Sequence, residues 1–350
     1  MNVGDCIFNA MRFANPPKGR PSKPPNLPPP ITAESTMKVL LNLELEEHQI
    51  AQIRAVSGDV EVVLPTTGAE VLAAMSEVDV VLGNFSPAMF EAAVNLRWVQ
   101  STGAGVDGVL HPALVDSDIV LTSAKGTVGV HLADHAMALL LGLTRGIWWA
   151  LRKPNWEQRF PIRQVSWELD GCTMGLIGLG GTGRAVAARA VGFGMRVVAV
   201  DPEPVARPRQ VEDCWGLDHL GHLLGRADVV VICAPLTSDT EGLFDRAAFH
   251  AMQRHALLIN VTRGRIVDEE ALLEALEKGW IGGAGLDVTP REPLPQDHPL
   301  WSMDNVIITP HTAGGSPRRQ DRIVGVFCDN LRRFLADQPL EGVIDKDKGY

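Results

Sequence analysis

The chain has 350 residues, of which 45% are hydrophobic and 21% are charged, so it can bury a large core, and its length favours two domains. Its formal net charge of -10 argues against a nucleic-acid-binding surface, which needs clustered Lys and Arg, but it allows an anionic small substrate held by one or two cations. The five cysteines are scattered without a C-x-x-C pair, which argues against a disulfide framework or a zinc ribbon and fits a reducing cytosol.

The N-terminal region predicts no folded structure. Residues 1–36 contain the stretch NPPKGRPSKPPNLPPP, which lacks backbone donors and apolar area to bury, so we expect a disordered Pro-rich extension. A polyproline ligand for an aromatic groove is the alternative. The N-terminal sequence has no charged segment followed by an apolar core and a cleavage site, so no secretory signal is predicted. We therefore expect a cytoplasmic protein.

Short β-branched runs then alternate with helical stretches, which is typical of parallel βαβ units. The first series comprises MKVLLNLEL, VEVVLP, VDVVLGN, LRWVQSTG and IVLTSA. One long amphipathic helix is expected to begin near Val130 and to run through HLADHAMALLLGLTRGIWWAL. Its longest uncharged run, residues 136–143, is too short to cross a bilayer, so no membrane span is predicted.

A second and tighter series follows Trp167, and a terminal helix in RRQDRIVGVFCDNLRRFLAD comes after it. The runs of this series are MGLIGLGGTG, MRVVAVDP, ADVVVICAP, ALLINVT, GAGLDV and NVIITPHTAG. The predicted fold class is α/β, with two doubly wound parallel-sheet domains, the first flavodoxin-like and the second of the Rossmann type. We place the first domain, which is discontinuous, at residues 37–132 and 315–350, and the second domain at residues 133–314.

A glycine-rich turn in the second series predicts a dinucleotide site. Gly178, Gly180 and Gly183 form G-x-G-x-x-G directly after an apolar strand and before an Ala/Val-rich helix. The first glycine allows a tight turn, the second lets the backbone approach a pyrophosphate, and the third lets helix and strand pack closely. The helix N-terminus then offers unpaired N–H groups to the phosphates.

The next strand ends in Asp201, at the spacing where an acidic residue is expected. A carboxylate there binds ribose hydroxyls and repels a 2′-phosphate, so NAD is favoured over NADP. Arg207 and Arg209 follow in the next loop and leave NADP as the alternative, if that loop folds back onto the site.

Three later strands each end close to a polar residue: Arg263 in NVTRGRIVDEEAL, Glu292 in DVTPREPLP and His311 in ITPHTAG. Carboxyl ends of parallel strands form the edge where ligands bind in open sheets. Reduction of a 2-keto acid needs a cation for the carboxylate and a proton donor at the developing alkoxide. Arg suits the first task and His the second, while a neighbouring carboxylate fixes the imidazole tautomer.

From Met37 almost to the C-terminus the chain resembles the D-isomer-specific 2-hydroxyacid dehydrogenase family. The resemblance rests on GLGGTG with Asp201, CAPLTSDTEGL, NVTRGRIVDEEAL, GAGLDVTPREPLP and TPHTAGGS, in that order and spacing. It implies that His311 is the general acid/base, that Glu292 is its partner, and that Arg263 binds the substrate carboxylate and carbonyl. It also implies backbone N–H contacts from Ala104 and Gly105 to that carboxylate, since Gly-rich backbone can form an anion nest.

The resemblance further implies a set of cofactor contacts at the pyrophosphate turn, the adenosine region, the nicotinamide face and the carboxamide. The residues beyond those named above are Gly181, Thr182, Pro235, Thr240, Val261 and Asp287. It also implies a homodimer, because the segment with Trp148, Trp149 and Trp156 packs against a partner subunit in that family; packing within one chain is the alternative. His131 and His135 are spaced like metal ligands but lack an H-E-x-x-H pattern, so no metal is predicted.

The sequence thus predicts an NAD-dependent 2-keto acid reductase that forms a small D-2-hydroxy acid. An NAD(H)-sensing binding protein of the corepressor type, on the same fold, is the main alternative. A third possibility is oxidation of a phosphorylated hydroxy acid. Which 2-hydroxy acid is the substrate depends on loops whose conformation the sequence does not determine.

Overall fold

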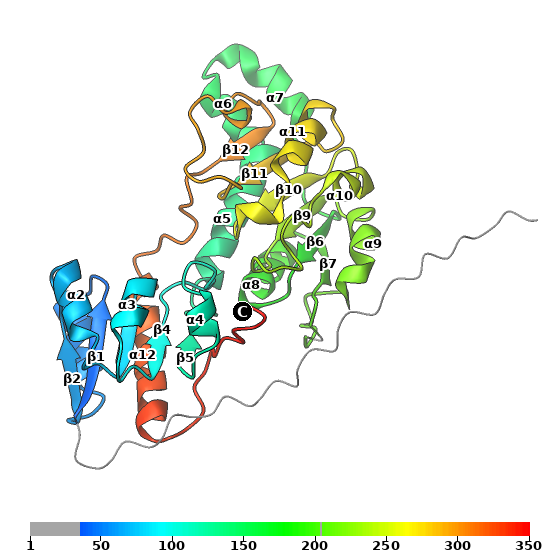
Figure 1. Cartoon of the computed structure of the whole chain (residues 1–350). Coiled ribbons are helices and arrows are strands. Elements are labelled where there is room, and N and C mark those ends of the chain that lie inside the picture. The colour runs from blue at the N-terminus through cyan, green and yellow to red at the C-terminus, as the bar shows by residue number, and fades with distance from the viewer. Residues whose placement is uncertain (1–35, 204) are drawn as a thin grey trace, which may run out of the picture.

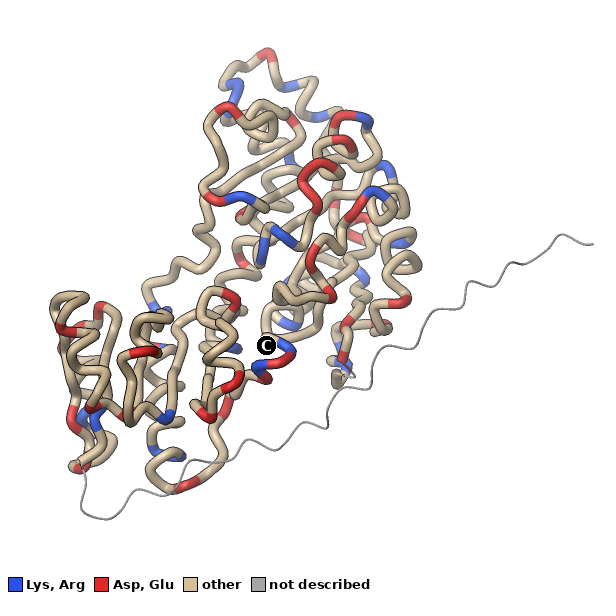
Figure 2. The backbone as a smooth tube through the Cα atoms, in the orientation of Figure 1, with Lys and Arg blue, Asp and Glu red and all other residues tan. Residues whose placement is uncertain are grey.

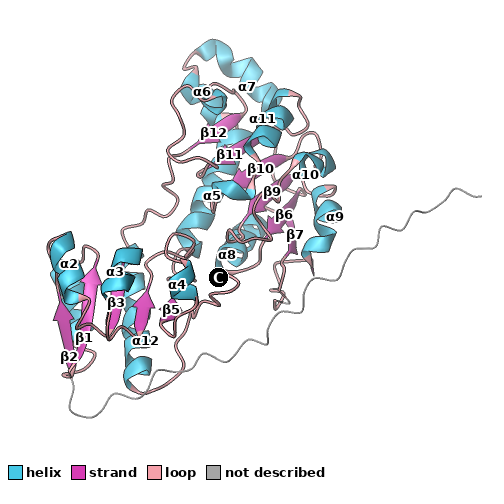
Figure 3. Cartoon of the chain, viewed as in Figure 1, coloured by secondary structure: helices cyan, strands magenta, loops and turns pink. Residues whose placement is uncertain are grey.

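The computed structural model describes residues 36–203 and 205–350, so the predicted Pro-rich extension lies outside the described residues apart from Thr36. The described chain folds into two parallel sheets, each covered by helices on both faces (Figure 1; Figure 3). The predicted fold class is therefore confirmed. Acidic and basic residues are interspersed over both parts of the molecule (Figure 2).

The first sheet has five parallel strands in the order β2-β1-β3-β4-β5, the doubly wound order of flavodoxin-like sheets. Its strands are β1 (Met37–Asn42), β2 (Val60–Val63), β3 (Val80–Gly83), β4 (Trp98–Gln100) and β5 (Val120–Thr122). The strands are rich in Val and Leu and, apart from the edge strand β2, are mostly buried, as strands covered on both faces are.

Helices from the two ends of the described chain cover one face of this sheet. α1 (Glu47–Arg54) and α12 (Arg319–Leu335) bury their apolar faces there, and Trp98 of β4 stacks on Phe327 of α12 with ring centroids 5.1 Å apart. The opposite face is covered by α2 (Gly68–Ala74), α3 (Pro87–Ala92) and α4 (Pro112–Val115). The last helix thus returns to the first sheet.

The second sheet has seven parallel strands in the order β12-β11-β10-β9-β6-β7-β8. Its strands are β6 (Thr173–Ile177), β7 (Arg196–Val200), β8 (Asp213–Trp215), β9 (Val229–Ile232), β10 (Leu257–Asn260), β11 (Gly283–Leu286) and β12 (Val306–Ile308). The chain leaves β6 toward β7 on one side and resumes at β9 on the other. This reversal is the point where a doubly wound sheet binds its ligand.

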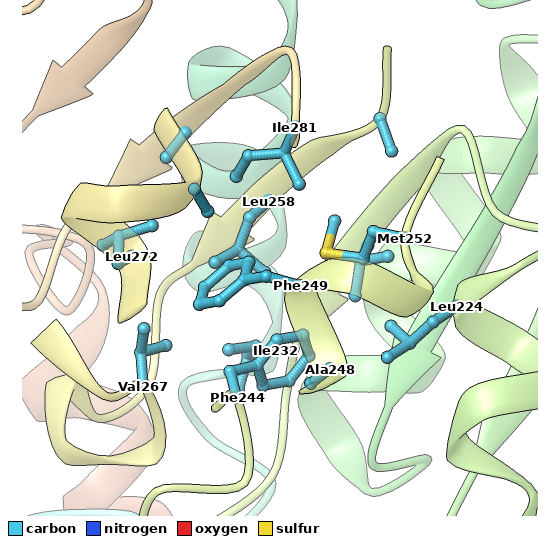
Figure 4. Close-up of a cluster of buried hydrophobic side chains, with 14 of the residues drawn as sticks. Leu224, Ile232, Phe244, Ala248, Phe249, Met252, Leu258, Val267, Leu272 and Ile281 are labelled. Atoms are coloured by element: carbon cyan, nitrogen blue, oxygen red, sulfur yellow. The ribbon is translucent and has the colours of Figure 1, made fainter. Parts of the chain in front are cut away.

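Two layers of helices enclose the second sheet. α5 (Gly129–Thr144) and α8 (Gly181–Gly192) cover one face, and α9 (Leu220–Leu224), α10 (Arg246–Ala251) and α11 (Glu269–Glu277) cover the other. Figure 4 shows the core on the second face, where Phe244, Phe249 and Leu258 pack beside Met252 and Ile281. Short 3-10 turns connect some of these elements: η2 (Leu217–His219), η3 (Gly264–Ile266) and η4 (Pro299–Trp301).

Two details differ from the sequence-based expectation. The helix predicted from Val130 onward is not continuous: α5 ends at Thr144, and Gly146, with φ of +63°, begins the separate helix α6 (Ile147–Arg152). A left-handed residue breaks the helical hydrogen-bond ladder, and glycine adopts it without steric cost. Strand β8 was not predicted, because its three residues are partly exposed and carry no apolar run. After α6 come η1 (Trp156–Gln158) and α7 (Arg159–Val165).

Candidate active site

A cavity of about 290 Å³ lies between the two sheets and takes its walls from both. The second sheet contributes the loops that follow β6, β7, β9 and β10, at the carboxyl edge around the topological reversal. The first sheet contributes the loops after β4 and β5. Most predicted site residues line this cavity: Ala104, Gly105, Gly178, Gly180, Gly181, Thr182, Asp201, Pro235, Thr240 and Arg263.

The glycine turn has a separate steric reason for each of its three positions. Gly178 has φ of +96°, and a Cβ there would lie 2.9 Å from the backbone nitrogen of Ala234. A Cβ on Gly183 would lie 2.2 Å from the carbonyl oxygen of Gly178, so this glycine lets α8 pack against β6, and it does not line the cavity. Gly180 differs, because a Cβ there would meet no protein atom within 4 Å. Nothing in the folded chain requires glycine at Gly180, whereas a ligand approaching the cavity wall would.

The end of the cavity at the loop after β7 carries two carboxylates. Asp201 follows β7 and accepts hydrogen bonds from the backbone N–H of Leu179 at 2.7 Å and of Glu203 at 3.0 Å. Glu203 also lines the cavity and was not predicted as a site residue. Arg207 donates to the backbone carbonyl oxygens of Val211 and Glu212, and it does not line the cavity. Arg207, one of the two cations predicted as possible partners of a 2′-phosphate, thus holds its own loop, and Arg209 does not line the cavity either.

These residues fit a dinucleotide. α8 begins at the cavity, so the N–H groups of its first turn and the positive end of its dipole face the same space as Gly180. In the loop after β9, which also lines the cavity, the buried Thr240 donates from its hydroxyl to the carbonyl of Pro235 at 2.7 Å and so fixes that loop. Cys233 stands at the start of this loop, and burial raises the pKa of its thiol to about 12, which keeps the sulfur neutral.

Arg263 connects the two parts of the molecule across the cavity. Its Nε and Nη2 atoms each lie 3.0 Å from Oδ1 of Asp107, and its Nη1 donates to the carbonyl of Thr262 at 2.9 Å. A Cβ on Gly105 would lie 2.2 Å from the Nη2 atom, so a larger residue there would displace the guanidinium from this position. The structure therefore brings Arg263 and the loop with Ala104 and Gly105 together. Asp107 was missed, although it stands in the same glycine-rich stretch.

His311 and Glu292 form a direct pair. The Nδ1 atom of His311 lies 2.7 Å from Oε2 of Glu292, and the other carboxylate oxygen accepts the backbone N–H of Thr289 at 3.1 Å. His311 has φ of +53°, a left-handed conformation that His adopts more readily than bulky or β-branched residues do. The side chains are 52% and 38% exposed, and neither residue lines the cavity. The pair thus leaves Nε2 of the imidazole available for another partner.

Asp287 supports the loop that carries His311. Its buried carboxylate accepts the hydroxyl of Thr309 at 2.6 Å and the backbone N–H groups of Thr312 and Ala313 at 2.8 and 2.9 Å. His135 reaches the same network from α5, with Nε2 2.8 Å from the Thr309 hydroxyl. Asp287 does not line the cavity, so its contact with a nicotinamide carboxamide stays a prediction. Val261 is also buried and outside the lining, and its predicted contact stays open in the same way.

Within residues 36–203 and 205–350, no group of three or more His, Cys, Asp or Glu side chains is arranged to hold a metal ion. The His131 and His135 side chains have different surroundings. Burial lowers the pKa of His131, and Arg322 adds to that effect, whereas His135 belongs to the Asp287 network. In the same described part of the chain, no helix combines the length and apolarity needed to span a membrane.

The chain is also similar in sequence to known proteins. The family model for the NAD-binding domain of D-isomer specific 2-hydroxyacid dehydrogenases matches residues 137–313. A glyoxylate reductase from Korarchaeum cryptofilum is 36% identical over 252 residues, which span 70% of this chain and 75% of that protein. A D-3-phosphoglycerate dehydrogenase from Methanocaldococcus jannaschii is 32% identical over 319 residues, which span 88% of this chain and 59% of that protein.

Solved structures are similar over most of the chain. The crystal structure of an NADPH-dependent glyoxylate/hydroxypyruvate reductase from Sinorhizobium meliloti, in complex with NADP and sulfate, matches with a TM-score of 0.76 and 30% sequence identity. The match covers 90% of this chain and 100% of that one.

Proposed function

The chain belongs to the D-isomer specific 2-hydroxyacid dehydrogenase family, and from that premise we propose that it reduces a small 2-keto acid to the D-2-hydroxy acid with NADH. Membership confirms the resemblance seen in the motifs, and with it an oxidoreductase that carries the family's NAD-binding domain. The observation that carries the finer proposal is the His311–Glu292 contact of 2.7 Å, on the same sheet edge as Arg263.

The proposed mechanism assigns one task to each residue. Arg263 binds the substrate carboxylate and polarises the C2 carbonyl, because a planar guanidinium can donate to two oxygens at once. A bound nicotinamide supplies the hydride that adds to C2. Protonated His311 gives its Nε2 proton to the carbonyl oxygen, so the C=O π bond becomes a C–H and an O–H bond. Glu292 holds the imidazole through Nδ1, which leaves Nε2 as the nitrogen that exchanges the proton.

We propose that the two domains close over the substrate during this reaction. The His311–Glu292 pair is partly exposed and lies beside the cavity rather than in its wall, while Arg263 and the loop around Gly105 already form part of that wall. Catalytic contacts tighten when an active site closes, and closure removes water from the reacting atoms. In the reverse direction, neutral His311 would act as the base that removes the hydroxyl proton.

NADH is proposed over NADPH because of the charges at the ribose end. Asp201 and Glu203 line the cavity there; Glu203 is paired with Lys348, whereas Asp201 accepts backbone N–H groups, so a 2′-phosphate would add negative charge beside the Asp201 carboxylate. The guanidinium of Arg207 is bound to carbonyls of its own loop.

The predicted domain boundaries and the predicted cytoplasmic location stay predictions.

A panel of 2-keto acids tests the proposed activity. We expect oxidation of NADH, followed by its absorbance, with at least one of glyoxylate, hydroxypyruvate, pyruvate or a bulkier aliphatic 2-keto acid, and phosphohydroxypyruvate is included in the panel for comparison. The value of kcat/KM should be at least about tenfold higher with NADH than with NADPH. A tenfold ratio corresponds to about 1.4 kcal/mol, and the charge of the 2′-phosphate beside a carboxylate should cost at least that much.

Methyl pyruvate is the matched control substrate, since it keeps the ketone but lacks the carboxylate that Arg263 would bind, and it should react poorly. Tight NADH binding without turnover of any keto acid would contradict the enzyme and favour a cofactor-sensing binding protein. Turnover of phosphohydroxypyruvate alone would instead place the chain with enzymes of phosphorylated hydroxy acids.

We further propose a homodimer through the segment from α6 to α7. This segment exposes large apolar side chains that a monomer would leave in water. Their exposed fractions are 50% for Ile147, 71% for Leu151, 85% for Trp156, 67% for Phe160 and 43% for Val165. Light scattering after size-exclusion chromatography should give twice the monomer mass, and Trp156→Glu should shift the protein toward monomer. A monomeric wild-type protein at micromolar concentration would contradict the dimer.

A further inference from the structure

The last residues of the chain, which we call the strap (residues 345–350), begin on the first domain. Just before the strap, the buried Ile344 donates its backbone N–H to the carbonyl of Leu121 in β5 at 2.9 Å. Lys346 then donates from Nζ to the carbonyls of Leu114 at 2.9 Å and Ile119 at 3.2 Å, and also to that of Ser117. Burial lowers the pKa of Lys346. The start of the strap is thus tied firmly to the end of α4 and to β5.

The strap itself is a closed turn. Oδ1 of Asp345 accepts the backbone N–H groups of Asp347 at 3.1 Å and Lys348 at 3.2 Å. The N–H of Gly349 donates to the carbonyl of Asp345 at 2.8 Å, and the N–H of Asp345 donates to the carbonyl of Tyr350 at 3.2 Å. Gly349 has φ of +82°, which only glycine adopts easily. These bonds fix where the Lys348 and Tyr350 side chains project.

The far end of the strap meets the second domain at Glu203. One carboxylate oxygen, Oε1, lies 2.5 Å from Nζ of Lys348 and accepts the hydroxyl of Tyr350 at 3.0 Å. Nζ of Lys125 lies 5.7 Å from the centroid of the Tyr350 ring. Figure 1 shows the C-terminal segment, in red, which leaves α12 and ends at the C-terminus near α4 and α8, and Figure 2 shows acidic and basic residues close to this end of the chain.

The strap also forms part of the cavity wall. Gly349 and Tyr350 line the same cavity as Asp201 and Glu203, the two carboxylates at its ribose end. The strap comes from the first domain, whereas these carboxylates follow β7 of the second domain. A dinucleotide held by the glycine turn would therefore have the strap beside it.

We propose that the strap is a part of the dinucleotide site that retains the bound cofactor, and that Glu203 holds it closed through Lys348 and Tyr350. This inference rests on the proposed function, because it takes the ligand to be the nicotinamide dinucleotide. The Lys348–Glu203 pair is about half exposed, with side chains 50% and 42% accessible. Exposed pairs are weak and screened by salt, so the strap can open for cofactor exchange without unfolding either domain.

The test uses the full chain and follows cofactor binding rather than turnover. Stopped-flow fluorescence measures the NADH dissociation rate of the wild type and of the Lys348→Met/Tyr350→Phe double variant, while thermal unfolding is measured without cofactor. The double variant should release NADH about tenfold faster, with a similar rise in Kd, because loss of a closing contact acts mainly on dissociation. The matched control is Lys278→Met, which removes an exposed ion pair with Glu274 (2.5 Å) at the end of α11, outside the cavity lining.

A double-mutant cycle distinguishes closure of the strap through Glu203 from a direct effect of the Lys348 charge on the cofactor. Glu203→Gln alone should speed NADH release, and adding the double variant to it should change the rate by less than about twofold, because both act through one contact. Additive effects, an unchanged dissociation rate, or a faster rate matched by lower stability of the cofactor-free protein would overturn the proposal. Failure of the wild type to bind NADH at all would instead contradict the proposed function.

Discussion

His311→Asn should lower kcat by about 10³-fold and leave the Kd of NADH within about twofold of wild type. The reason is that Asn tolerates the left-handed backbone of His311, φ +53°, but has no proton to exchange near neutral pH. Loss of turnover would then report the missing acid rather than a distorted loop. Steady-state kinetics with the best keto acid and a fluorescence titration with NADH measure the two quantities.

His255→Gln is the control for this substitution. His255 is another exposed imidazole, 59% accessible, and its Nε2 lies 2.7 Å from a carboxylate oxygen of Asp228. It is remote from the cavity lining, so its loss should leave kcat within about twofold of wild type, as for ordinary surface substitutions. A similar fall in kcat in both variants, or a His311→Asn enzyme that retains most of its activity, would remove His311 from the mechanism.

Arg263→Gln should lower kcat/KM for the keto acid by about 10³-fold. Each charge-assisted hydrogen bond contributes about 1.5–3 kcal/mol, and the substitution removes two such bonds to the substrate carboxylate and carbonyl. Both KM and kcat should be affected, because the guanidinium would bind the substrate and also compensate the charge that develops on oxygen. The Kd of NADH should change by less than about threefold, since Arg263 is not assigned to the pyrophosphate or ribose contacts.

Arg265→Gln is a close control, because it lies two residues further along the same segment. Its Nη2 atom lies 2.5 Å from a carboxylate oxygen of Glu241, and the side chain is 59% exposed and outside the cavity lining. It should leave kcat/KM within about twofold of wild type. Equal effects of the two substitutions, or an Arg263→Gln enzyme that discriminates pyruvate from methyl pyruvate as well as wild type does, would contradict the assignment.

Most of the fold could be predicted from the sequence, because its signals are local. Each strand except the partly exposed β8 coincides with an apolar run, and the fold class followed from the alternation of such runs with helices. The break at Gly146 was missed because a single glycine inside an apolar helical pattern does not show whether it continues the helix or ends it. Whether the helix continues depends on the packing of α6 and α7, which the hydrophobic periodicity of α5 does not reveal.

The candidate site, too, could be predicted only in part from the sequence. The His311–Glu292 contact and the cavity position of Arg263 agree with the arrangement that the resemblance implied, whereas the roles of these residues remain to be tested. Asp287 shows that a motif does not by itself reveal which groups a residue contacts. The sequence places it beside the site, but in the folded chain its carboxylate is buried and bonded to the loop of His311.

By itself the sequence determined the order of strands and helices, the glycine turn at Gly178 and the acidic end of β7. These features depend on hydrophobic periodicity and on steric limits within a few residues. Only the tertiary structure decided that Asp107 pairs with Arg263, 156 residues later, and that Tyr350 meets Glu203 at the cavity. Such contacts depend on how two separately folded sheets pack and how their loops bend, and no local pattern of residues encodes either.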